Sequence, residues 1–185
     1  MLSIAVSVLA FGLLGNTIAA AAPGCTNLQQ DEHKFYSLRS FRGDLTTAGA
    51  RVVADFQFPD RYRWTMGAMT GTIIGTNGWM SVNGHVMVMP APMVAMLQTR
   101  LQSIRSLGLQ GNLAYQFTVT PTGTQMLDGV LTCTYHLVKK TGDYLLDWWI
   151  AKDEGLPLKA VATVSGRTAT ILYSHYNEPL EINAP

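Results

Sequence analysis

The chain has 185 residues and is nearly neutral, with 13 Lys and Arg against 12 Asp and Glu, a net charge of +1. Apolar residues make up 48% of the chain and charged residues 14%, a balance that excludes an intrinsically disordered protein and allows a real core. Because nucleic-acid binding needs several basic side chains aimed at phosphates, this charge argues against a nucleic-acid partner. We therefore expect one globular domain.

The N-terminal segment has the pattern of a secretory signal peptide. An uncharged apolar run over residues 2–14 is followed by a stretch of alanines at 19–22. The run is shorter than the ~20 residues that a spanning helix needs, and no basic flank follows it. We predict that residues 1–21 are a signal peptide, that residues 22–185 form a single domain, and that the protein is exported to an oxidising compartment. A membrane-spanning helix is the alternative.

The two cysteines, Cys25 and Cys133, are predicted to form a disulfide, because an exported protein folds in an oxidising compartment. Closing a loop of about 100 residues stabilises a fold by ~4 kcal/mol in the chain-entropy model. The bridge would hold the N-terminal segment against a strand. Two alternatives stay open for these residues: a lipid-modified Cys25, and a catalytic thiol.

Most of the remaining chain follows the two-residue period of β-strands. The first clear run, residues 50–58, alternates apolar and polar side chains, is broken by Pro59-Asp60, and resumes over 62–66. Pairs such as Asn77-Gly78 and Thr122-Gly123 favour hairpin turns. We therefore expect an antiparallel meander, with further strands at 71–75, 78–82, 114–120, 130–139, 144–152, 158–164 and 167–173.

One segment, residues 92–107, has the spacing of a helix instead. Pro92 falls in its first turn and Gly108 follows its end, as is typical of helix boundaries. Its apolar side chains recur at helical spacing and share one face, formed by Met93, Met96, Leu97, Leu101, Ile104 and Leu107.

The distribution of charge is the most informative feature of the sequence. No Asp, Glu, Lys or Arg occurs from Trp64 to Thr99 or from Ser106 to Leu127, and seven of the nine methionines fall in the first of these stretches. Methionine is flexible and polarisable, and it suits surfaces that accept ligands of variable shape. A single sheet with one main helix cannot easily bury all of this apolar surface, so we expect a hydrophobic cavity. Ordinary core packing is the alternative for each single residue.

Motifs of well-known catalytic chemistry are missing from the sequence. There is no G-x-S-x-G, H-E-x-x-H or C-x-x-C, and no glycine-rich phosphate or dinucleotide loop. His175 and Glu178 form an H-x-x-E, but it runs into Pro179 at a strand end rather than lying on a helix, which disfavours a shared metal. We expect a non-enzymatic protein without a cofactor.

Five short motifs stand in order along the chain. They are F-Q-F-P-D-R-Y-R-W from Phe56, G-T-I-I-G-T-N-G-W from Gly71, V-N-G from Val82, W-W-I-A-K-D-E-G-L-P-L-K from Trp148 and Y-S-H-Y-N-E-P-L-E-I-N-A-P from Tyr173. In this order and spacing they resemble the periplasmic outer-membrane lipoprotein carriers (the LolA-like superfamily) and the related lipid-carrier lipoproteins of mycobacteria. The resemblance covers roughly residues 35–185.

The resemblance implies an α+β fold that is mainly antiparallel β, a strongly curved incomplete barrel with one or two helices packed on its concave side. It implies a periplasmic carrier or sensor that binds a lipid, or the acyl chain of a lipoprotein, in a hydrophobic cavity between sheet and helix. The alternative is a protein-interaction or envelope-stress regulatory module that uses the same sheet to hold an inner- or outer-membrane protein. The ligand-facing candidates that it implies are Tyr62, Trp64, Met66, Ile74, Trp79, Met80, Met93, Met96, Leu97 and Leu101.

Overall fold

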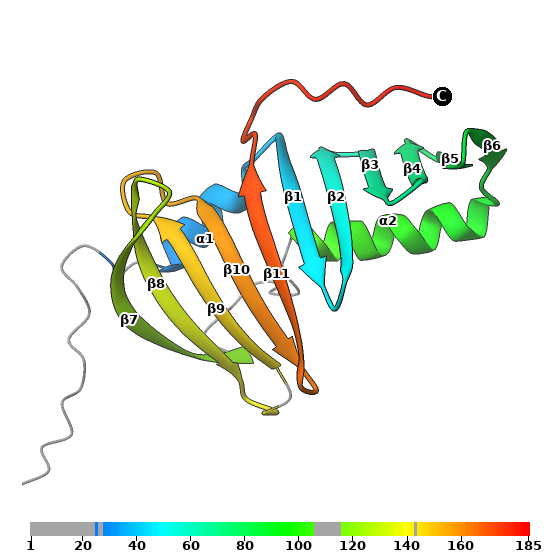
Figure 1. Cartoon of the computed structure of the whole chain (residues 1–185). Helices are drawn as coiled ribbons and strands as arrows, with labels where there is room; N and C mark the ends of the chain where they lie inside the picture. Colours follow the sequence, from blue (N-terminus) through cyan, green and yellow to red (C-terminus); the bar gives the residue numbers. More distant parts are fainter. Residues whose placement is uncertain (1–24, 26–27, 106–115, 143) are drawn as a thin grey trace, which may run out of the picture.

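The computed structural model of the chain describes residue 25 and residues 28–105, 116–142 and 144–185. Within these ranges one eleven-stranded antiparallel sheet curves around two helices (Figure 1). The strand order is β6-β5-β4-β3-β2-β1-β11-β10-β9-β8-β7, so β1 and β11 join the two halves of the sheet, and β6 and β7 are its open edges. The expected curved, incomplete barrel is confirmed.

The elements follow one another along the chain as α1 (Leu28–Tyr36), β1 (Ser40–Thr47), β2 (Ala50–Gln57), β3 (Arg61–Met66), β4 (Met69–Ile74), β5 (Asn77–Val82), β6 (His85–Val88), α2 (Ala91–Arg105), β7 (Phe117–Leu127), β8 (Val130–Lys139), β9 (Tyr144–Ala151), β10 (Pro157–Val164) and β11 (Arg167–Ser174). The meander and the helix near residue 92 were expected, whereas α1, β1 and β6 were not. The predicted signal peptide lies outside the described residues and stays a prediction. None of the described helices has the length and apolar character needed to cross a membrane.

Two of the predicted turns are wrong, and each has a physical reason. Asn77-Gly78 lies in β5, because the chain turns earlier, at Gly75-Thr76. A Cβ on Gly78 would lie 2.6 Å from Cγ2 of Val94, so this glycine allows α2 to approach the sheet closely. Thr122-Gly123 lies inside β7, where a shift of register between Pro121 and Gly123 marks a β-bulge.

The register of the strands assigns the side chains to two different faces. Phe41 pairs with Phe56, Phe56 with Tyr62, and Tyr62 with Ile73, so these residues and their alternate neighbours share one face. All four are buried. The opposite, convex face carries ion pairs between neighbouring strands, such as Arg42–Asp55, at 2.6 Å.

An aromatic cluster fixes α1 on the concave face. The ring of Phe35 lies 5.1 Å from that of Phe41 and 5.9 Å from that of Tyr173, and Phe41 stacks on Phe56 at 4.5 Å. Such pairs contribute ~0.5–1.5 kcal/mol each beyond the burial of their area. The cluster therefore covers the joint between β1 and β11.

The second helix, α2, begins beside β6 and runs crosswise to the strands toward the middle of the sheet (Figure 1). Val94 is buried against Gly78, and the side-chain amide of Gln98 donates a hydrogen bond of 2.5 Å to the carbonyl of Gly75. Gly78 shares its face with Ile73, its partner in the ladder. Both helices thus lie on the concave side, as expected.

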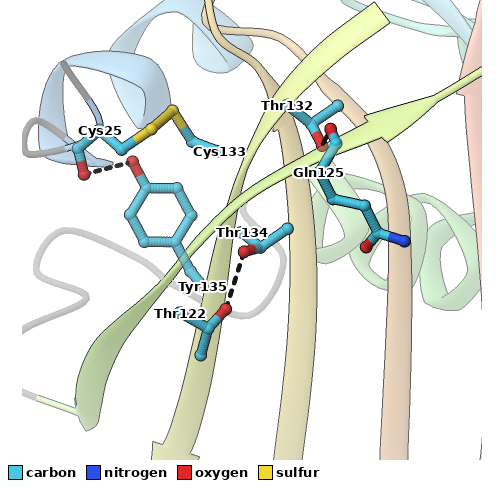
Figure 2. Close-up of a disulfide and its surroundings, with 7 residues drawn as sticks. All are labelled: Cys25, Thr122, Gln125, Thr132, Cys133, Thr134 and Tyr135. Carbon is cyan, nitrogen blue, oxygen red and sulfur yellow. Dashed lines mark hydrogen bonds between the residues drawn. A yellow bond between two sulfur atoms is a disulfide. The ribbon is translucent and has the colours of Figure 1, made fainter. Parts of the chain in front are cut away.

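The predicted disulfide between Cys25 and Cys133 is confirmed (Figure 2). It joins the chain just before α1 to β8, and both residues are buried. The hydroxyl of Tyr135 donates a hydrogen bond of 3.0 Å to the carbonyl of Cys25. Burial, with a smaller contribution from Asp31, raises the pKa of Tyr135 to about 12, so this donor keeps its proton. Because the two sulfur atoms are bonded to each other, neither a catalytic thiol nor a lipid-modified Cys25 fits this structure.

Reduction of the disulfide is expected to lower the free energy of unfolding by ~4 kcal/mol, because the unfolded chain regains the freedom that the bridge removes. Thermal melting with and without a reducing agent measures the effect. A variant with both Cys25→Ala and Cys133→Ala is the control, since its melting temperature should no longer respond to the reductant. A wild-type melting temperature that is unaffected by reduction would contradict the bridge.

Replacing Gly155 by alanine is expected to loosen α1 from the hairpin between β9 and β10. Gly155 has a φ of +68°, and a Cβ there would lie 2.4 Å from Oδ1 of Asp31 and 2.7 Å from Nζ of Lys34. That lysine donates to the carbonyl of Glu154 at 2.9 Å. The matched control is Gly166→Ala, with a φ of +77° and open space around the added carbon.

Both alanine variants carry the cost of a left-handed backbone, ~1–3 kcal/mol, and only Gly155→Ala adds crowding against α1. Chemical denaturation should therefore show a larger loss of stability for Gly155→Ala than for Gly166→Ala. Equal losses would mean that the contact with α1 does not contribute to stability.

Candidate functional site

A continuous row of residues crosses the concave face from the middle of the sheet to its β6 edge. Seven residues stand in register across seven strands, and we call them the concave row: Tyr173, Gly43, Ala54, Trp64, Gly71, Met80 and Met87. The row contains no charged side chain. With neighbouring strands ~4.8 Å apart, it spans about 29 Å along the sheet, enough for an extended acyl chain.

Burial changes along this row. Tyr173 is 5% exposed and lies beneath α1, whereas Met87 at the edge is 53% exposed. Ala54, Trp64 and Met80 between them are half-buried. The concave row is thus closed at one end and open to solvent at the other.

The two sides of the concave row also differ. On one side the neighbouring residues Tyr62 and Ile73 are buried, and Gly78 lies under Val94 of α2. On the other side Met66 is 40% exposed. The row therefore follows the boundary between the packed core and solvent.

Two positions of the concave row, Gly43 and Gly71, have no side chain, and the space above them differs. A Cβ on Gly43 would meet its nearest neighbours, Ile171 and Phe56, only at 3.9 Å, so the space above it is not crowded. The space above Gly71 is taken by the indole of Trp64, whose Cζ2 would lie 1.9 Å from an added Cβ. Trp64 therefore lies flat over its cross-strand partner and presents an aromatic surface within the row.

Two buried polar atoms near the closed end have no hydrogen-bond partner among the described residues: Nε1 of Trp148 and the hydroxyl of Tyr173. Trp148 is only 1% exposed. Both belong to the concave face, because Trp148 pairs with Ala160, which pairs with Ile171, two residues from Tyr173. Almost all buried polar groups in proteins are hydrogen-bonded, and leaving one unpaired costs ~1–3 kcal/mol. The two donors thus lack an acceptor in a largely apolar surrounding.

Burial raises the pKa of Tyr173, and the nearby Tyr144 adds to this shift. The hydroxyl of Tyr173 therefore keeps its proton at physiological pH and remains a donor. Indole Nε1 is a donor only. Each group is therefore a hydrogen-bond donor that has no acceptor among the described residues.

The structure separates the strand residues that the sequence grouped as ligand-facing. Tyr62, Trp64, Met66 and Met80 share the concave face, as their pairing with Ile73, Gly71, Met69 and Met87 shows. Ile74 and Trp79 have the opposite parity, since Ile74 pairs with Asn77 and Trp79 with Thr72. They lie on the convex face and do not join the others. The motif-based assignment ignored the alternation of side chains within β4 and β5.

The helix candidates divide in a similar way. Met93 and Met96 are 40% and 48% exposed, whereas Leu97 and Leu101 are partly buried against the core. The first pair adds to the exposed apolar surface near the β6 edge, and the second pair anchors the helix. Val94 is more buried than any of them, at 2%.

Three residues on the concave face were not among the sequence-based candidates: Trp148 and Tyr173, which carry the buried polar atoms described above, and the exposed Met87. Period-two alternation within 167–173 could have placed Tyr173 on the face of Ile171. Its position beside Gly43 depends on the pairing of β1 with β11, strands from opposite ends of the chain. The alternation of side chains within a single strand cannot predict which distant strand it pairs with.

Among the described residues, no three His, Cys, Asp or Glu side chains gather in a way that could hold a metal ion. His175 and Glu178 approach each other at 4.0 Å between Nε2 and Oε2, and both side chains are exposed. Their spacing in the sequence thus produces a surface contact.

Comparison with known proteins identifies the fold. No family model and no curated protein matches the chain. Among solved structures, the lipoprotein LppX of Mycobacterium tuberculosis matches with a TM-score of 0.61 and 16% identity, over 86% of this chain and 98% of that one. LprF of Mycobacterium bovis matches with a TM-score of 0.66 and 14% identity, over 89% and 98% of the two chains. The chain has the fold of these mycobacterial proteins.

A third match is MucB of Pseudomonas aeruginosa, in a structure of the MucA/MucB complex. Its TM-score is 0.52 at 15% identity, over 89% of this chain and 62% of that chain. The shared unit therefore corresponds to part of that longer chain. At these identities the likeness concerns the fold, and it confirms the architecture that the sequence motifs indicate.

The unpartnered hydroxyl has a measurable consequence for the protein without ligand. Tyr173→Phe is expected to leave the free energy of unfolding unchanged or to raise it by ~1 kcal/mol, because it removes a buried polar atom that has no partner. Tyr135→Phe is the matched control and should destabilise by ~1–3 kcal/mol, since it leaves the carbonyl of Cys25 unpaired. Urea denaturation of both variants measures the difference. A clear loss of stability in Tyr173→Phe would show that its hydroxyl is bonded in the free protein.

Proposed function

We propose that the protein is a non-enzymatic carrier that binds the acyl chain of a lipid or lipoprotein along the concave row, beside α2. The observation that carries the proposal is the uncharged row itself, which runs from Tyr173, whose hydroxyl has no partner among the described residues, to the exposed Met87 at the β6 edge. The signal-peptide pattern and the buried disulfide support a periplasmic location.

The apolar surface accounts for the affinity. Each methylene moved from water to an apolar site contributes ~0.8 kcal/mol, so a chain of about 14 carbons gains on the order of 11 kcal/mol. Costs of association and ordering reduce this by several kcal/mol, which leaves a micromolar-range affinity. Such an affinity suits a carrier, because a carrier must also release its ligand.

Each part of the concave row has a role in this proposal. Met87 on β6 and Met93 on α2 are exposed, adaptable apolar side chains at the open end, where a chain can enter. Trp64 provides a flat surface at the centre. At the closed end the hydroxyl of Tyr173, which has no partner among the described residues, donates a hydrogen bond to a carbonyl oxygen of the ligand.

A second candidate function is the binding of a protein partner, such as an inner- or outer-membrane protein. The observation that favours it is the open edge strand β6, whose Val86 and Val88 are 51% and 76% exposed. An extended segment of another chain can add to such an edge. The fold that this chain shares with MucB, which forms a complex with MucA, agrees with this second candidate.

Placing a charge on the concave row tests the carrier function. Met87→Glu is expected to weaken the binding of the fluorescent fatty acid cis-parinaric acid at least about tenfold, because a carboxylate beside an acyl chain loses hydration. Val88→Glu is the matched control: it lies on the same exposed strand but on the convex face, and its affinity should stay close to wild type.

Fluorescence titration of the purified wild type and both variants measures this difference. Tyr173→Phe should also bind more weakly although its fold is intact. A wild type that does not bind the probe, or equal losses in Met87→Glu and Val88→Glu, would contradict the carrier function.

Mass spectrometry of the natively purified protein then separates the two candidates, since a stoichiometric lipid favours the carrier and a stoichiometric membrane protein favours the interaction module.

A further inference from the structure

A groove on the convex face is a second candidate site, separate from the concave row. It has a volume of about 410 Å³ and lies over β7, β8 and β9. The side chains that form it include those of Thr134, Asp147 and Trp149, which have the opposite parity to the core residues Tyr135 and Trp148. Small-molecule sites have volumes of roughly 300–1,000 Å³, so the groove can hold one small polar ligand.

One wall of the groove is an indole that is held in place from two directions. Nε1 of Trp149 donates a hydrogen bond of 2.7 Å to Oε1 of Gln125 on β7. Nζ of Lys159 on β10 lies 4.7 Å from the centre of the ring. Because its edge and one face are both engaged, the ring is oriented before any ligand binds.

The other wall consists of hydroxyl groups. Thr122 donates a hydrogen bond of 2.8 Å to the hydroxyl of Thr134, and both lie beside the bulge of β7 (Figure 2). Bulges re-aim side chains, and here the bulge brings the hydroxyl of Thr122 next to that of its neighbour on β8.

A carboxylate completes the lining. Oδ1 of Asp147 lies 2.6 Å from Nδ1 of His136, its partner across the β8–β9 ladder. The side chain of Asp147 is 48% exposed. A carboxylate has a second oxygen, Oδ2, that can accept further hydrogen bonds.

We propose that this groove binds a neutral saccharide. A sugar ring has an apolar face of C–H groups, which packs on an indole, and a rim of hydroxyls, which both donate and accept hydrogen bonds. The groove offers both features in one place: the ring of Trp149, and a rim formed by Gln125, Asp147, Thr122 and Thr134.

The charges around the groove disfavour other ligands. Asp147 repels an anion, and Lys159 over the indole opposes a cation. The hydroxyl and carboxylate lining would have to lose water for an acyl chain without gaining any hydrogen bond. A neutral polyhydroxylated ligand avoids all three costs.

Titration with soluble neutral trisaccharides tests the proposal on the full-length protein. Maltotriose, cellotriose and chitotriose are the probes, and isothermal titration calorimetry gives their affinities. Trp149→Ala is expected to weaken the binding of the preferred probe at least about tenfold, whereas Trp149→Phe, which keeps an aromatic face, should lose less. Trp79→Ala is the matched control, because Trp79 is half-buried on the same convex face but lies on β5, away from the groove.

Asp147→Asn is a second variant, which keeps the size of the side chain and removes its charge. It should bind the preferred trisaccharide several-fold more weakly, so the test does not depend on how well Trp149→Ala folds. Wild-type protein that binds none of the three probes would overturn the proposal, and so would unchanged affinity in both Trp149→Ala and Asp147→Asn. An equal loss in Trp79→Ala would also overturn it. Met87→Glu should retain saccharide binding, which keeps this test separate from that of acyl binding.

Discussion

The pairing of β1 with β11 joins the two halves of the sheet, and the concave row depends on it. Gly43 stands opposite Tyr173 in this ladder, so residues near opposite ends of the chain become neighbours. The aromatic contacts of Phe35 with Phe41 and Tyr173 lie over the same joint. A slip of one residue would turn Tyr173 to the convex face and interrupt the row, because side chains alternate with a period of two.

That alternation allows one sheet to carry two unrelated chemistries. Trp148 and Trp149 are consecutive residues of β9, yet the side chain of the first is buried in the concave core and that of the second lies on the convex face. The concave row is apolar and uncharged, whereas the convex face holds ion pairs, hydroxyls and amides. A substitution on one face therefore leaves the side chains of the other face unchanged.

Similarity to solved structures supports the fold of this protein, whereas its proposed function is argued from the residues of the sites. LppX, LprF and MucB share the curved sheet at 16% identity or less, which establishes architecture. Function has to be argued from the sites that a fold carries. Here that argument rests on the concave row, from Tyr173, whose hydroxyl has no partner among the described residues, to the exposed Met87.

The sequence by itself determined the local features of this protein: the meander, the helix near residue 92, the single disulfide and the fold class. The meander, the helix and the disulfide follow from side-chain periodicity, helix boundaries and cysteine number. The fold class follows from five ordered motifs that resemble a known family. Alternation within β5 already separates Trp79 from Met80, but only the tertiary structure decided which of the two faces the concave side and that Gly78 lies under Val94 of α2. It also placed Tyr173 beside Gly43 and formed the convex groove at the bulge of β7. The reason is physical: periodicity reports the faces of one segment, whereas register, bulges and contacts between distant strands arise only when the chain packs on itself.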